Sequence, residues 1–250
     1  MSSSVRGVGG RGKQPLRVGA TPVPHAEILD FVRPMVARAG IDLRIEVFED
    51  FDGPNESLAA GRLHANFFQY RPFLDEFNRR TGNGLVPVAP VHVEPFGLYS
   101  TFVATLAELP EYAELALPGD PVNVHRSLTM LDELGLIDCA PRHQALATPA
   151  DVRANPRSLV LKEMAGWLLA GVRADFDAVF LFGNQAIEWG VDIGGALHCE
   201  RGNPTYAEYL VARRDNCEDA SIRCLAAALN SNETRDFMAT AYAGQVLPAF

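Results

Sequence analysis

The most constraining feature of this chain is the segment 66–74, where an aromatic-rich strand runs directly into a helix that begins at a proline. Pro72 suits the first helical turn because its missing N–H would have had no hydrogen-bond partner there. In open α/β sheets, ligands bind at this end of the strands. The aromatic side chains that flank the corner are Phe68, Tyr70 and Phe73. A buried helix face made by Phe73 and Phe77 is an alternative interpretation of the same spacing.

Short strands and amphipathic helices alternate around this corner, which is typical of an α/β fold. Pro24 opens a helix that ends at Gly40, and Pro34 is expected to kink it. Asn55 is expected to cap the following helix. The expected strands are 16–20, 41–47, the segment that ends at the aromatic corner, and 85–89, and the expected helices are 24–39, 55–62 and 72–78.

A second unit of the same kind is expected in the middle of the chain. Its expected elements are an extended crossing at 97–104, helical sequence from 106 to 112, the loop 118–123 with the helix after it, and the apolar strand 178–182. The chain then returns through the strand 209–212 and the helical segment 219–243. We predict two α/β lobes, with 16–105 and 205–250 in lobe I and 106–204 in lobe II.

Composition narrows the class of partner. The formal net charge of -9 would repel nucleic acid phosphates, so the sequence predicts no nucleic acid partner. Residues 1–15 are expected to be a disordered tail. Within it, 7–13 has the spacing of a phosphate-binding loop, but Gln14 replaces the Ser or Thr that would hold magnesium. We expect neither a secretory apolar segment nor a lipid-attachment cysteine, because the first cysteine is Cys139.

Arg126 is the strongest candidate for holding an anion. We expect it in the first turn of the helix after Asn123, where a positive charge opposes the helix dipole. An anion bound by the guanidinium and by the unpaired N–H groups of that turn would compensate. The alternative is a surface arginine paired with Asp120.

Asn184 follows the strand 178–182, so its amide either caps the next helix or contacts a ligand. His25 and His125 are expected near the cleft, but no nucleophile elbow, zinc-binding helix or paired Cys/His spacing accompanies them. His92 and the other histidines form no ligand pattern. The sequence therefore predicts no enzyme, no metal site and no cofactor.

Four motifs occur in a characteristic order along the chain. They are Pro24-His25-Ala26-Glu27-Ile28-Leu29, Gln69-x-x-Pro72-x-Leu74 after Ala65-Asn66, Glu94-Pro95-Phe96-Gly97-Leu98-Tyr99-Ser100, and Val246-Leu247-Pro248-Ala249-Phe250. Over roughly residues 16–250 the sequence resembles the methionine-binding lipoprotein family of ABC importers. The resemblance implies a two-lobed, type II-like periplasmic-binding-protein fold, in which each lobe is a mixed sheet flanked by helices and the ligand lies in the cleft between them.

The resemblance also implies roles for individual residues. The family's carboxylate-binding arginine matches Arg126, and its ligand-binding asparagines match Asn184 and, less closely, Asn203. Recognition of the ligand's side chain would fall to Phe51, Phe68, Tyr70 and Phe73, whose aromatic faces suit a thioether. The sequence departs from the family pattern at four of these positions. Tyr70 stands where His is usual, Phe73 and Phe51 where Tyr is, and Gln185, also placed at the site, where an aromatic residue is.

The resemblance implies a solute-binding protein that captures methionine or a close relative and delivers it to the permease subunits of an ABC importer. It further implies a monomer in the cell envelope, either periplasmic or attached to the membrane. The alternative is a cytosolic amino-acid sensor or a small enzyme that reuses the same scaffold. This alternative rests on the altered pocket residues and on the missing export signal.

Overall fold

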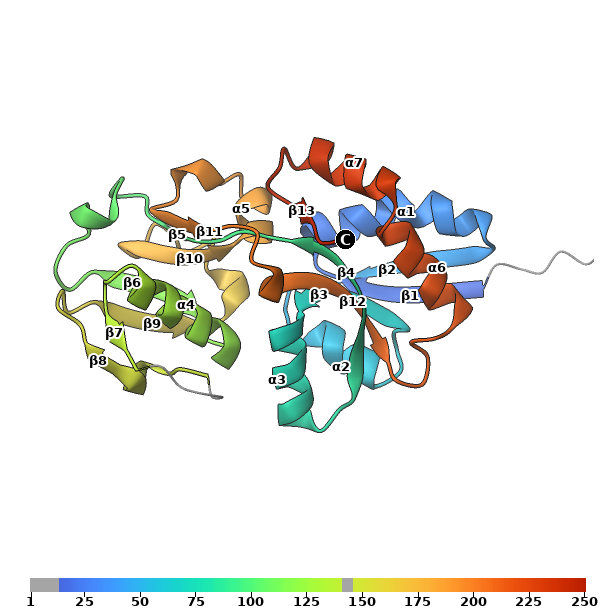
Figure 1. Ribbon diagram of the computed structural model, residues 1–250, viewed down its shortest axis with the longest axis horizontal. Helices are drawn as coiled ribbons and strands as arrows, with labels where there is room; N and C mark the ends of the chain where they lie inside the picture. Colours follow the sequence, from blue (N-terminus) through green and yellow to red (C-terminus); the bar gives the residue numbers. More distant parts are fainter. Residues whose placement is uncertain (1–13, 141–145) are drawn as a thin grey trace, which may run out of the picture.

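A computed structural model describes residues 14–140 and 146–250 of the chain. The chain forms two lobes side by side along the long axis of the molecule, each built on one sheet (Figure 1). The glycine-rich segment 7–13 and most of the expected tail 1–15 lie outside the described residues. Gln14 and Pro15, which the sequence analysis placed in that tail, belong to strand β1 (Gln14–Ala20) because they pair with Ile41 and Asp42.

The first lobe contains a six-stranded sheet in the order β13, β4, β12, β3, β1, β2. Strand β1 pairs in parallel with β2 and β3, whereas β12 runs antiparallel to β3 and β4, so the sheet is mixed. The strands are β2 (Ile41–Val47), β3 (Ala65–Tyr70), β4 (Leu85–Val93), β12 (Ala207–Arg213) and β13 (Leu247–Pro248). The helices are α1 (Glu27–Arg38), α2 (Gly53–Ala59), α3 (Arg71–Thr81), α6 (Ala220–Leu229) and α7 (Asn232–Ala241).

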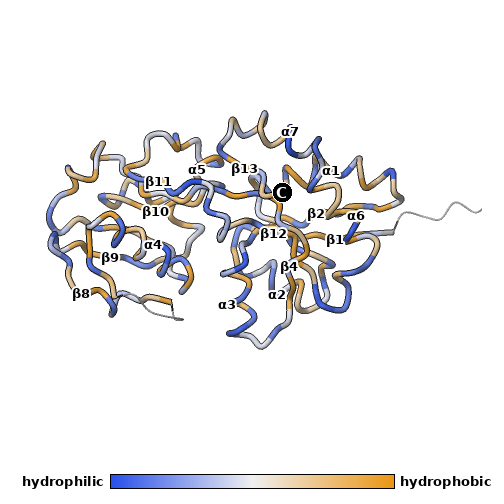
Figure 2. Tube along the Cα trace, in the orientation of Figure 1, coloured by the Kyte–Doolittle hydropathy of each residue, from blue (hydrophilic) through white to orange (hydrophobic). Residues whose placement is uncertain are grey.

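Helices cover both faces of this sheet. Along β12, Leu210 and Ala212 pack with α1, α6 and α7, and Val211 packs with α2 and α3. The alternation follows from the two-residue period of a strand, which sends successive side chains to opposite faces. Figure 2 shows hydrophobic stretches along the central strands and hydrophilic stretches along α3.

The second lobe contains a five-stranded mixed sheet in the order β11, β5, β10, β6, β9. Its strands are β5 (Phe96–Tyr99), β6 (Glu114–Pro118), β9 (Val160–Met164), β10 (Ala178–Phe182) and β11 (His198–Glu200). Helices α4 (Pro121–Glu133) and α5 (Gly183–Glu188) follow β6 and β10, and a small hairpin joins β7 (Asp138–Cys139) to β8 (Val152–Ala154). This lobe has its own core of buried apolar residues around Leu115, Leu128 and Phe180.

The chain crosses between the lobes twice. The first crossing is the short segment between β4 and β5, and the second lies between β11 and β12. The lobe boundaries predicted from the sequence place residues 96–105 in lobe I, but β5 pairs with β10 and β11 in the second sheet. The expected crossing at 97–104 is therefore partly a strand, and the chain enters the second sheet directly after Pro95.

Two local expectations differ from the structure. The helix expected at 106–112 is only a single turn, Leu106–Glu108. Asn55 does not cap α2, which follows Asp52 instead. Asn55 is fully buried, and its side chain exchanges hydrogen bonds with Asn66 and Gln69, so tertiary contacts outweigh its capping tendency. None of the helices within 14–140 and 146–250 is long and apolar enough to cross a bilayer.

Candidate ligand-binding site

A pocket lies between the two sheets, at the corner where β3 meets α3. The first lobe and the two crossings contribute His25, Phe51, Phe68, Gln69, Tyr70, Phe73, Glu94, Pro95, Tyr206 and Glu208, and the second lobe contributes Asn123, Arg126, Phe182 and Asn184. All of the site residues predicted from the sequence are in this lining except Gln185 and Asn203. The predicted residues from both lobes are therefore brought together in one place.

The aromatic corner forms because β3 ends at Tyr70 in an extended conformation and α3 begins at the next residue, with Pro72 in its first turn. The ring of Phe73 lies edge to face with Phe68 and Tyr70, at 6.1 and 6.2 Å between centroids. Phe77 belongs to the core with Leu58 and Leu74, whereas Phe73 faces the pocket. The two phenylalanines therefore do not form the single buried helix face that was the alternative.

Phe51 brings the first lobe into contact with the second. Its ring packs edge to face against Phe182, at 5.8 Å between centroids, and against Trp167 at 6.3 Å. Phe51 lies in the loop before α2, yet it joins the edge of the second lobe's core. The aromatic wall of the pocket is thus built from both lobes, and it suits an apolar or thioether group.

Arg126 lines the same pocket, with its guanidinium carbon 5.7 Å from the ring centroid of Tyr70, and only 5 % of its side chain is exposed. Its Nε donates a hydrogen bond to Glu200 Oε2 at 2.9 Å, and its guanidinium lies 3.6 Å from the ring centroid of Tyr206 and 4.4 Å from that of Phe96. The guanidinium offers further N–H donors beyond Nε, so a carboxylate in the pocket can still be bound by a fork of hydrogen bonds.

One expectation about Arg126 was wrong, and the alternative interpretation of this residue is excluded. Helix α4 begins at Pro121, ahead of Asn123, so Arg126 lies beyond its first turn and the helix dipole acts on it only weakly. The alternative partner, Asp120, caps that helix instead, accepting hydrogen bonds from the backbone N–H and side-chain amide of Asn123 at 3.0 and 2.8 Å. A surface arginine paired with Asp120 is therefore excluded.

Tyr70 links the two lobes through a hydrogen bond. Its hydroxyl donates to Asn123 Oδ1, and Asn123 is itself held by Asp120. Burial, followed by the nearby Asp120 carboxylate, raises the pKa of Tyr70 well above its ordinary value, so the hydroxyl stays protonated and can act as a donor. Asn123, which the sequence analysis did not single out as a site residue, thus fixes the orientation of a predicted one.

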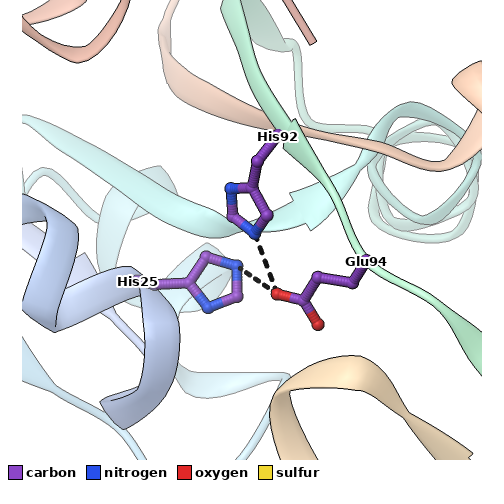
Figure 3. Close-up of side chains that lie close together, drawn as sticks. All are labelled: His25, His92 and Glu94. Carbon is purple, nitrogen blue, oxygen red and sulfur yellow. Dashed lines mark hydrogen bonds and ion pairs between the residues drawn. The ribbon is translucent and has the colours of Figure 1, made fainter. Parts of the chain in front are cut away.

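A buried cluster of histidine and carboxylate side chains lies beside the pocket, and His25, Glu94 and Glu208 of this cluster line it. Figure 3 shows His25 and His92 directed at the same oxygen of Glu94, with His92 Nε2 at 2.9 Å and His25 Nε2 at 3.5 Å from Oε1. The other oxygen of Glu94 accepts a hydrogen bond from the backbone N–H of Asn184 at 2.7 Å. Glu94 therefore joins the crossing segment to the start of α5.

Burial shifts the pKa values of two side chains in this cluster, His25 and Glu208. It lowers the pKa of His25 well below the ordinary value, and the neighbouring His92 lowers it further, so His25 is neutral at pH 7. Burial also raises the pKa of Glu208 well above its ordinary value, and the nearby Glu94 carboxylate adds to that increase. Glu208 lies on β12 and its Oε2 is 3.9 Å from His25 Nε2.

The donor atoms of His25, His92 and Glu94 lie within 4.8 Å of one another, which is close enough to hold a metal ion. Their arrangement suits a hydrogen-bonded network better. Ligands of a tetrahedral zinc ion are about 3.3 Å apart when each metal bond is about 2.0 Å. His92 Nε2 and Glu94 Oε1 are 2.9 Å apart, which is the distance of a direct hydrogen bond.

Gln185 and Asn203 are the two predicted site residues that do not line the pocket, and both form hydrogen bonds with residues around it. Gln185 is buried, and its side-chain amide donates to the Gly166 carbonyl at 2.7 Å. Asn203 accepts a hydrogen bond from the Thr205 backbone N–H at 3.1 Å and donates to Glu200, the residue that pairs with Arg126. Asn203 therefore positions Arg126 through Glu200, and Tyr206 occupies the pocket in its place. His125 is also outside the lining, and its Nδ1 accepts from the Ala147 N–H at 3.1 Å.

Comparison with known proteins identifies the family of this chain. The family model described as NlpA lipoprotein matches residues 16–250. The methionine-binding lipoprotein MetQ of Bacillus subtilis (strain 168) is 35% identical over 244 residues, which span 95% of this chain and 89% of that protein.

Solved structures extend this similarity to the fold. A nutrient-binding protein from Burkholderia cenocepacia bound to methionine has a TM-score of 0.91 at 28% identity, covering 94% of this chain and 100% of the other. A periplasmic substrate-binding protein of an ABC transporter from Coxiella burnetii has a TM-score of 0.88 at 30% identity, with 94% and 100% coverage. These relatives are substrate-binding proteins and not enzymes. With its two-lobed fold and a family match over residues 16–250, the chain belongs to the NlpA lipoprotein family.

Proposed function

We propose that this protein binds free methionine or a close relative between its two lobes. The observation that carries the proposal is the composition of one pocket, which is lined both by the aromatic side chains of Phe51, Phe68 and Phe73 and by the buried guanidinium of Arg126. A thioether fits the aromatic wall and a carboxylate fits the guanidinium. The methionine-bound relative from Burkholderia cenocepacia supports the same ligand.

In this proposal Arg126 binds the ligand's carboxylate through its Nη groups, and Phe51, Phe68 and Phe73 surround the side chain. Asn184 lies beside them at the start of α5, with its side chain at the pocket. Tyr70 closes the gap between the lobes through Asn123. Binding is achieved by enclosure of the ligand between two lobes, and no bond in the ligand changes.

A thermal-shift panel of the twenty amino acids tests this ligand class. A ligand that binds only the folded protein, at 100 times its Kd, adds about 2.7 kcal/mol to the free energy of unfolding. We expect methionine to raise the melting temperature of ligand-stripped protein most, and aspartate and glutamate to have no effect because carboxylates already line the pocket. A panel in which no amino acid raised the melting temperature would rule the proposal out.

We further propose that the protein acts as a monomer in the cell envelope and passes its ligand to the permease of an ABC importer. Support comes from relatives named as lipoproteins and as a periplasmic component of such a transporter. Methionine uptake by vesicles that hold the permease should require this protein, and in the native cell it should fractionate with the envelope. Uptake at the same rate without the protein, or recovery only from the cytoplasm, would contradict this part of the proposal.

A further inference from the structure

A second cavity, of about 500 Å³, adjoins the ligand pocket between α3 and the end of β9, and we call it the outer cavity. Phe51 and Phe73 line both spaces, so two side chains of the aromatic wall also border the outer cavity. The outer cavity reaches the surface, since Trp167, which lines it, is 42 % exposed. Because α3 belongs to the first lobe and β9 to the second, both lobes contribute to it.

The outer cavity carries an excess of negative charge. Its described lining holds one cation, Arg80, and four carboxylates, which are Asp52, Glu76, Asp120 and Glu163. Arg80 lies 3.5 Å from Asp52, and Glu76 is paired with Arg79. Glu163 has no ion-pair partner among residues 14–140 and 146–250, so its charge is free to act on a ligand.

Aromatic side chains surround the same space. The ring of Phe51 lies edge to face with that of Trp167, and Phe73 lies on the first lobe's side of the cavity. A cation within about 6 Å of the centre of an aromatic ring is attracted to its face, and sites for methylated ammonium groups are built from such rings. Aromatic rings together with carboxylates therefore favour a group that is both apolar and positively charged.

The proposed ligand brings its sulfur atom to the boundary between the two spaces. The proposed function places the thioether against Phe51 and Phe73. Atoms in contact are roughly 3.5–4 Å apart, so groups on the two sides of such a ring are about 7–8 Å apart. This distance does not exceed the Debye length of about 8 Å at physiological salt, so the outer carboxylates act on a charge at the sulfur. Arg126 does not cancel this attraction, because Glu200 and the ligand's carboxylate balance it.

We propose that the pocket and the outer cavity together bind sulfonium derivatives of methionine, in which the sulfur carries a further alkyl group and a positive charge. This inference rests on the proposed function, because it keeps the same positions for the ligand's carboxylate and sulfur. Glu163 is then a residue that determines specificity, since no cation of the described protein takes up its charge. Methionine has no charge at sulfur, so its own binding does not depend on Glu163.

The test compares three amino acids that differ only at the sulfur position. They are methionine, S-methylmethionine and 2-amino-5-methylhexanoic acid, in which a C–H group replaces the sulfonium sulfur, so that the shape is kept and the charge is lost. Each is titrated by calorimetry into ligand-stripped wild type, Glu163→Lys and Glu46→Lys. Glu46 is an exposed carboxylate on β2 that lines neither cavity, so its variant has the same net charge as Glu163→Lys. The melting temperature of each ligand-free variant is measured alongside.

We expect wild type to bind S-methylmethionine about tenfold more tightly than the neutral analogue, within the range of about 2- to 30-fold that a cation–π contact contributes. A rise in salt from about 0.1 to 1 M should reduce this preference, because the Debye length falls from about 10 to 3 Å.

The two variants should differ from each other. In Glu163→Lys, S-methylmethionine should bind at least about threefold more weakly, because an attractive charge becomes a repulsive one, while methionine and the neutral analogue change less than about twofold. Glu46→Lys should leave all three affinities unchanged, and both variants should melt within a few degrees of wild type because the two glutamates are exposed.

Equal affinities of wild type for S-methylmethionine and the neutral analogue would overturn the inference, because the charge would not be recognised. A preference that persists in Glu163→Lys, or that falls equally in Glu46→Lys, would overturn the role of the outer cavity. A wild type that binds methionine and neither larger compound would overturn the inference and leave the proposed function standing. A wild type that binds none of the three would refute the proposed function, and this inference with it.

Discussion

At the scale of a single residue, the contacts of Arg126 fall into two groups, those with the protein and those available to a ligand. It pairs with Glu200 and packs between aromatic rings, which stabilises the second lobe, and it presents its remaining N–H groups to the pocket. A helix-dipole argument alone predicts that its removal would leave the stability of the empty protein unchanged. The buried ion pair reverses that expectation, because removal leaves Glu200 without its cation.

We therefore predict that Arg126→Ala lowers both the affinity for methionine and the free energy of unfolding of the empty protein. Affinity for methionine should fall at least about 100-fold, as for a buried ion pair that loses one partner. The free energy of unfolding of the empty protein should drop by on the order of 2 kcal/mol, less than for a fully buried pair because Glu200 is 21 % exposed. Calorimetric titration measures the first quantity and urea denaturation the second.

The double variant Arg126→Ala with Glu200→Ala is the control that separates the two roles. It removes the carboxylate that the single variant leaves unpaired, so stability should recover in part while affinity stays low. Methionine affinity within threefold of wild type in the single variant would contradict the role of Arg126 as the carboxylate partner.

Sequence reasoning identified the aromatic residues of the pocket and missed its acidic residues. Phe68, Tyr70 and Phe73 stand at a strand end joined to a proline-started helix, and this local pattern fixes where they point. Glu208 is the one charged residue in 207–212, the part of β12 before Arg213, and sequence reasoning overlooked this signal. Glu200 could not be identified as the partner of Arg126 from the sequence, because the two residues are 74 positions apart and only the fold brings them together.

At the scale of elements, the site depends on joints where at most two residues separate the end of a strand from the start of a helix. The joints from β3 to α3, from β6 to α4 and from β10 to α5 all supply pocket residues. The joints after β3 and β10 were predictable because an aromatic or apolar run ends there and a helix-start signal follows at once, whereas the strand β6 was not predicted. The single turn at Leu106–Glu108 and the burial of Asn55 were not, because tertiary contacts decide them.

The joint between β10 and α5 packs closely against the first crossing, and Gly183 makes this approach possible. A Cβ at Gly183 would lie 2.6 Å from Pro95 Cδ and 2.9 Å from Glu94 Cβ. Gly183→Ala should therefore push α5 away from the crossing and weaken the hydrogen bond from Asn184 to Glu94. We predict a loss of about 1–3 kcal/mol in the free energy of unfolding and weaker methionine binding.

Gly84→Ala is the matched control for this change. The nearest atom to a Cβ at Gly84 is Arg214 Nε, at 3.8 Å, so the substitution meets no obstacle. Its free energy of unfolding should stay within about 0.5 kcal/mol of wild type, and its affinity should not change. Equal denaturation midpoints for the two variants would show that the joint tolerates a side chain and would refute the argument from close packing.

At the scale of the whole molecule, the two crossings explain how distant segments form one site. The chain leaves the first sheet after β4, builds the second sheet and returns to the first through β12, which lies between β4 and β3. Both Glu94, before β5, and Glu208, on β12, lie where the lobes meet. The two-lobed architecture was predictable from the alternation of elements and from the family resemblance, but the exact crossing point depends on pairing of β5 in the second sheet.

Calorimetric titration of methionine into the ligand-stripped wild-type protein is the most direct test that the two lobes enclose one amino acid. Burial of the ligand's side chain against Phe51, Phe68 and Phe73 should give a negative heat-capacity change between two temperatures. We predict saturable binding of one methionine per chain. Absence of saturable heat at millimolar methionine, with the protein folded, would contradict the assignment of this pocket as a methionine site.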